Sequence, residues 1–122
     1  MAEGVALQET FERVDSALRA SGLDYAFIGA LAAIAWGRTR ATTDVDLVVA
    51  CSPQAFALLN TALVGAGLRA GAPVGPADPA DVLPDIAVYW TTVAPPVRVD
   101  VFVAKTRFED AVLASKKFAS ML

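Results

Sequence analysis

The stretch from Tyr25 to Ala50 constrains the fold more than any other part of the chain. Residues 25 to 28 form a short apolar run that is typical of a strand, and Gly29 follows where a helix would begin, through residues 30 to 36. A polar loop then leads into a second strand-like run, residues 44 to 50. The stretch therefore predicts an apolar strand, a helix that opens at a glycine, a polar loop and a second strand.

The second strand-like run begins with two aspartates, Asp44 and Asp46. Residues two apart in a strand project from the same face, about 6.6 Å apart along the chain. Like charges this close raise each other's pKa unless a cation lies between them, and Mg²⁺ prefers carboxylate oxygens. The pair is therefore a candidate seat for one or two magnesium ions, and the alternative is a solvated pair at the strand entrance. The opposite face of the run is apolar and is expected to face the core, through Val45, Leu47 and Val49.

The composition limits the chemistry that this chain can perform. Its 122 residues are most simply one domain, residues 1 to 122, and the net charge of -3 argues against binding nucleic acid through the overall field. The chain has no histidine, so proton or metal chemistry must use carboxylates. A single cysteine, Cys51, excludes an internal disulfide and fits the cytoplasm, where we expect a buried, inert thiol. No apolar run is long enough to cross a bilayer, so we expect no membrane partner.

The loop before Asp44 and the turn at Gly29 carry the signals for binding an anion. A glycine between a strand and a helix lets a ligand approach the backbone, and the free amides at the helix start suit a phosphate; the alternative is a tight turn. The loop contains Arg40, Thr42 and Thr43. Arg40 could hold a carboxylate or phosphate in a bidentate fork while a threonine caps the turn, or the loop arginines could neutralise the aspartates.

The remaining elements follow from periodicity and turn residues. Apolar residues at helical spacing predict an amphipathic helix over residues 5 to 20, and Ser52-Pro53 begins another that ends near Gly65 or Gly67. Residues 71 to 84 contain four prolines and predict a surface flap or a disordered loop. Two strand-like runs, 86 to 92 and 97 to 103, predict an antiparallel hairpin, and a capping box at residues 106 to 109 opens a last helix.

The second strand of that hairpin carries the third acid, Asp100. Valines occupy one face of this run, and Arg98, Asp100 and Phe102 occupy the other. If the run pairs beside the strand of Asp44 with the acids on one face, three carboxylates meet within reach of a metal. The alternative is an exposed acid that pairs locally with Arg98.

These pieces resemble the nucleotidyltransferase superfamily of the DNA polymerase beta type. That family has a strand, a Gly-Gly or Gly-Ser helix start, an Asp-x-Asp on the next strand and a third acid on a later strand. Gly29-Ala30 stands at the helix start here, with alanine in place of the second Gly or Ser. The run from Gly37 to Leu47 is similar to the G-x-x-R-x-T-x-D-x-D-L signature of a small bacterial branch that includes abortive-infection and toxin-antitoxin nucleotidyltransferases.

The resemblance implies a domain of the α/β (α+β) class, with a mixed β-sheet of about four to five strands flanked by helices. It implies Mg²⁺, or Mn²⁺ in its place, held by Asp44, Asp46 and Asp100, with Asp100 activating an acceptor hydroxyl. The nucleoside triphosphate would rest on the turn at Gly29 and Ala30. The acceptor would be a protein, a transfer RNA or a small molecule, within a toxin-antitoxin pair in one version of this hypothesis. The alternative is a catalytically inactive binding module of the same fold that neutralises or pairs with a toxin or antitoxin.

Overall fold

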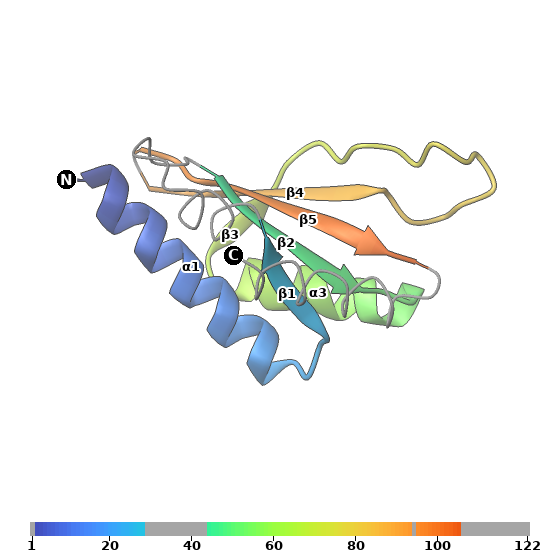
Figure 1. The fold of residues 1–122 in the computed structure, drawn as a ribbon, viewed down its shortest axis with the longest axis horizontal. Coiled ribbons are helices and arrows are strands. Elements are labelled where there is room, and N and C mark those ends of the chain that lie inside the picture. Colours follow the sequence, from blue (N-terminus) through green and yellow to red (C-terminus); the bar gives the residue numbers. More distant parts are fainter. Residues whose placement is uncertain (1, 29–43, 94, 106–122) are drawn as a thin grey trace.

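The computed structural model describes residues 2–28, 44–93 and 95–105 of the chain. In this part the chain forms a five-stranded sheet with the order β1-β2-β5-β4-β3, shown in Figure 1. Strands β2 and β5 are parallel, and the other neighbours are antiparallel. The elements are α1 (Ala2–Ala20), β1 (Tyr25–Ile28), β2 (Asp44–Ala50), α3 (Pro53–Gly65), β3 (Leu68–Ala70), β4 (Ile86–Thr91) and β5 (Arg98–Ala104). The sheet is therefore mixed and the class is α+β, which confirms the coarse expectation from the sequence.

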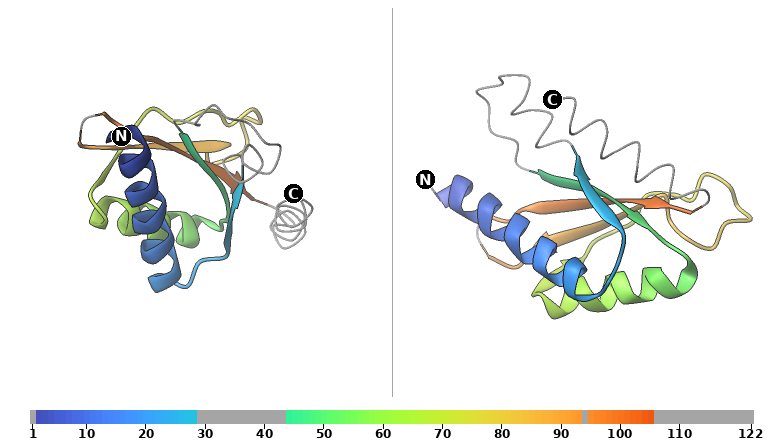
Figure 2. Two further views of the ribbon diagram at one scale, coloured as in Figure 1. Left: turned by 60° about the vertical axis from the view of Figure 1, so that its left-hand side comes forward. Right: turned by 60° about the horizontal axis from the view of Figure 1, so that its bottom comes forward.

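Helices α1 and α3 lie on the same face of the sheet (Figure 2). This face carries alternate residues of β2 and β5, and those of β2 are at most 1% exposed. Burial of large aliphatic side chains, each worth about 1.5–3 kcal/mol, provides the main driving force for folding. The core is formed by Val14 and Leu18 of α1, Leu59 and Leu63 of α3, Val45, Leu47 and Val49 of β2, Val99 and Val101 of β5, and Tyr89 of β4.

Local sequence explains where α3 begins. The Ser52 hydroxyl accepts a hydrogen bond from the amide of Ala55 at 3.1 Å, and Pro53 occupies the first turn. A serine cap followed by proline satisfies an exposed amide and fixes the backbone for helix entry. The structure confirms this predicted start, and α3 ends at Gly65, the nearer of the two predicted ends.

Two features differ from the expectations drawn from the sequence. Helix α1 begins at Ala2 rather than at residue 5. A short strand, β3, follows α3 and pairs with β4 from Leu68 to Ala70. Three residues are too few to show an alternating pattern, so only pairing with β4 identifies this strand.

The proline-rich segment forms a loop that is attached to the sheet at several points. Val74 forms an isolated bridge with Ile86, and the amide of Asp85 donates to the carbonyl of Val74 at 2.9 Å. Lys105, just after β5, pairs with Asp81 at 2.9 Å and with Asp85 at 2.5 Å. The loop thus has no helix and one bridge to the sheet, in agreement with its four prolines.

Two predicted helices lie outside the described residues. These are the helix expected over residues 30 to 36 and the last helix expected to open at residues 106 to 109. The predicted hairpin is confirmed, because β4 and β5 pair antiparallel from Ile86↔Phe102 to Trp90↔Arg98. Neither α1 nor α3 is apolar and long enough to cross a membrane, and these are the helices within the described residues.

Candidate functional site

The register of β2 and β5 places the three predicted acids on one face of the sheet. Asp46 pairs with Asp100, and Asp44 pairs with Arg98 one row away. Register partners on neighbouring strands lie about 4.8 Å apart and point to the same side. Figure 1 shows the two strands side by side. Asp44, Asp46 and Asp100 are therefore neighbours on the face opposite to α1 and α3, and we refer to them as the acidic cluster.

The acidic cluster is crowded enough to disturb the ionisation of its central member. The pKa of Asp46 is raised to about 6, chiefly by burial and then by the negative charges of Asp100 and Asp44, while the charge of Arg98 partly offsets this rise. Asp46 lies between apolar neighbours as well as acids, because its partner on β1 is Ile28. Negative charge is therefore concentrated at the acidic cluster, and a bound cation would reduce the repulsion between its carboxylates.

Arg98 provides the positive charge that the structure shows at the acidic cluster. Its Nε donates to Oδ1 of Asp100 at 2.7 Å, and the side chains of Arg98 and Asp100 are 38% and 16% exposed. This hydrogen bond and the nearby carboxylates raise the pKa of the guanidinium. The local pairing considered for Asp100 from the sequence is thus present, but Asp100 is a largely covered acid rather than an exposed one.

Strand β4 adds an aromatic residue to this face that the motif search had not selected. Trp90 is the register partner of Arg98, and Cζ of Arg98 lies 5.9 Å from the centroid of the indole ring. Val88 is the corresponding partner of Asp100. The alternation within β4 could have indicated this, because Tyr89 faces the core and Val88 and Trp90 must then face the acids.

The donor chemistry of the acidic cluster suits a hard divalent cation. Three carboxylates supply oxygen atoms, which are the ligands that Mg²⁺ prefers. As the side chains stand, no group of three or more His, Cys, Asp or Glu residues within the described ranges is arranged to hold a metal ion. The hydrogen bond from Arg98 to Oδ1 of Asp100 places a positive charge beside the oxygens that a cation shared by all three acids would use, so arginine and cation compete for this carboxylate.

The predicted nucleotide-binding residues cannot be placed beside the acids. Gly29, Ala30, Arg40, Thr42 and Thr43 all lie outside the described residues. The strands that lead into and out of this segment are described, and Ile28 pairs with Asp46. Ile28 and Asp44, the described residues on either side of this gap, thus both lie at the acidic cluster.

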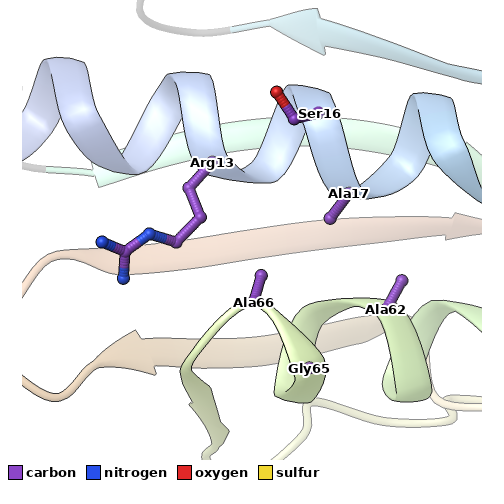
Figure 3. Close-up of a pocket in the computed structure, with 6 residues that line it drawn as sticks. All are labelled: Arg13, Ser16, Ala17, Ala62, Gly65 and Ala66. Atoms are coloured by element: carbon purple, nitrogen blue, oxygen red, sulfur yellow. The ribbon is translucent and has the colours of Figure 1, made fainter.

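Two cavities lie away from the acidic cluster. One of about 390 Å³ opens between α1 and α3 and is lined by Arg13, Ser16, Ala17, Ala62, Gly65 and Ala66 (Figure 3). The other, of about 260 Å³, lies between α3, β4 and the proline-rich loop, with Phe56, Asn60 and Tyr89 in its wall. The hydroxyl of Tyr89 is hydrogen-bonded to the side-chain oxygen of Asn60. In Figure 3 the side chain of Arg13 projects from α1 and its guanidinium lies to the left of Ala66, while small side chains form the rest of the wall.

A scan against protein-family models and a search of curated proteins found no significant match for this chain.

Proposed function

We propose that this chain is a metal-dependent nucleotidyltransferase, which moves a nucleoside monophosphate from a nucleoside triphosphate to an acceptor hydroxyl. The observation that carries the proposal is the pairing of Asp46 with Asp100 on adjacent parallel strands, with Asp44 on the same face. Three carboxylates that meet by tertiary pairing, rather than by sequence proximity alone, supply the ligands that phosphoryl-group chemistry uses. The signature residues from Gly37 to Leu47 support the same proposal.

In this function the acidic cluster would hold Mg²⁺ or Mn²⁺, which when bound stabilises negative charge on the phosphates. Asp100 would accept the proton of the acceptor hydroxyl. The hydroxyl oxygen forms a bond to the α-phosphorus, and the bond from that phosphorus to the bridging oxygen breaks, so that pyrophosphate leaves. The acceptor class proposed is a protein, a transfer RNA or a small hydroxyl compound, within a toxin-antitoxin pair.

The second candidate function is a binding module that lacks catalysis and pairs with a toxin or an antitoxin. The ion pair between Arg98 and Asp100 favours it, because the arginine already offsets part of the negative charge that would attract a metal. The two candidates differ in whether this pair opens when a cation and a nucleotide are present.

Transfer of a radiolabel tests the first function directly. The full chain is incubated with Mg²⁺ or Mn²⁺, each α-labelled ribonucleoside triphosphate, and either total transfer RNA or a protein extract as acceptor. We expect label in one acceptor fraction, and its loss in the Asp46→Asn and Asp100→Asn variants. Asp24→Asn is the matched control, because Asp24 is an exposed acid before β1.

The outcomes separate the two candidates. Transfer that survives in Asp46→Asn would exclude the acidic cluster as the catalytic site. Absence of transfer with every nucleotide, together with unchanged binding of a partner protein by Asp46→Asn, would favour the binding module.

A further inference from the structure

The guanidinium of Arg98 lies within the acidic cluster rather than beside it. Arg98 precedes Asp100 by two residues on β5, so both side chains project from the same face, and the register places Arg98 next to Asp44. Its contact with Asp100 uses Nε and a single carboxylate oxygen. An arginine can bind an anion through two parallel N–H groups, so this one-point contact leaves part of its donor capacity for another anion.

Trp90 and the backbone of Gly71 hold this guanidinium in place. The indole ring lies 5.9 Å from Cζ of Arg98, within the range of a cation–π interaction. A Cβ atom added to Gly71 would lie 3.0 Å from Nε1 of Trp90, so the glycine backbone packs closely against the indole edge. Arg98 is thus supported on one side by an aromatic ring and bonded on the other to Asp100.

The charges of these groups nearly match one divalent cation. Within the described part of the chain, Asp44, Asp46 and Asp100 carry three negative charges when ionised and Arg98 carries one positive charge, so their sum of two negative units matches a single Mg²⁺. Arg98 also donates to Oδ1 of Asp100, so its positive charge lies next to a carboxylate that a metal shared with Asp46 would use.

We propose that Arg98 is the resident counterion of the acidic cluster and controls its loading with metal. Arg98 holds Asp100 until the phosphates of a nucleoside triphosphate draw the guanidinium into a two-point contact, which frees Asp100 for the cation. Metal and nucleotide therefore load together rather than independently. The identity of the anion as a nucleoside triphosphate rests on the proposed function. The competition between Arg98 and the metal is independent of that function.

Titration with Mn²⁺ alone tests the competition. Free Mn²⁺ is measured by electron paramagnetic resonance in the wild type and in Arg98→Met, Arg98→Lys and Arg19→Met, without nucleotide. We expect Arg98→Met to bind Mn²⁺ about tenfold more tightly, because one positive charge near a divalent ion is removed in a largely solvated setting. Arg98→Lys should stay near the wild type. Arg19→Met is the matched control, since Arg19 pairs with Asp15 at 2.9 Å on α1, across the sheet.

A second variant keeps the charge and removes the aromatic support. Trp90→Leu should tighten Mn²⁺ binding by a factor of about 2 to 5, which corresponds to the usual strength of a cation–π contact. Thermal unfolding of each variant shows whether it folds. If Arg98→Met does not fold, Trp90→Leu still tests the inference. Unchanged or weaker Mn²⁺ binding in folded Arg98→Met or folded Trp90→Leu would overturn the inference, because Arg98 would then support the acids structurally.

The joint loading has its own measurement. The wild type should bind Mn²⁺ more tightly when a non-hydrolysable ATP, CTP or GTP analogue is present, after correction for Mn²⁺ bound by the nucleotide itself, and Arg98→Met should lose most of this gain. If the wild type transfers nucleotide but Arg98→Met gains no Mn²⁺ affinity, the inference fails and the proposed function stands. If Arg98→Met gains affinity but no transfer occurs with any acceptor, the competition stands and the proposed function fails.

Discussion

Replacing Asp46 by asparagine should stabilise the metal-free protein at neutral pH while it removes the proposed activity. Asp46 has a pKa raised from 3.8 to about 6, because burial and two neighbouring carboxylates disfavour its charged form. Because the pKa of Asp46 is higher in the folded chain, the folded chain binds more protons than the unfolded chain at pH values between the two pKa values. Stability is therefore lost as the pH rises through this window, and the full penalty is present above about pH 6.

The magnitude follows from the size of the pKa shift. About two pKa units at about 1.4 kcal/mol each give an upper limit near 3 kcal/mol. Asp46 is only partly buried, so solvent screening reduces the expected gain of Asp46→Asn to about 1–2 kcal/mol. Most of the gain should disappear by pH 4, where the wild-type carboxyl is protonated in the folded chain and close to half protonated in the unfolded chain.

Urea unfolding followed by tryptophan fluorescence measures this difference. The wild type, Asp46→Asn and Asp24→Asn are compared at pH 8 and pH 4 in the presence of a metal chelator. Asp24→Asn should leave the free energy of unfolding within about 0.5 kcal/mol of the wild type, because Asp24 is exposed. An Asp46→Asn variant that is less stable than the wild type at pH 8, or equally stabilised at both pH values, would refute the electrostatic reasoning.

Three further outcomes follow from single contacts. Ser52→Ala should lower the free energy of unfolding by about 1 kcal/mol in urea titrations, because the amide of Ala55 loses its cap, and Ser52→Asp should restore it. Lys105→Met should speed hydrogen exchange at the amide of Asp85. The hydrogen bond to Lys105 holds the pKa of the Asp85 carboxyl below its ordinary value. In the wild type, protection of this amide against exchange should therefore fall as the pH drops through that pKa. Burial raises the pKa of Cys51 to about 11, so at pH 8 a thiol reagent should modify the urea-unfolded chain but not the native one; equal rates would contradict the burial.

The sequence alone determined the elements whose signals are local. Alternation of acids or polar residues with aliphatic ones predicted β2 and β5 and the face of each that carries Asp44, Asp46 and Asp100. Burial of the opposite face follows from the same period of two, because successive side chains in a strand point to opposite sides. The serine and proline before α3 fixed its start for an equally local reason, since the cap bonds within one turn.

Only the tertiary structure decided which strands are neighbours and how the charges pair. The parallel pairing that sets Asp46 beside Asp100 joins residues 54 positions apart, and no local pattern specifies it. Arg98 likewise has Trp90 beside it only because a third strand, β4, pairs with β5 and brings the indole ring to this face. Strand order and side-chain rotamers are set by packing between distant segments, whereas periodicity reports only which side of each segment is apolar.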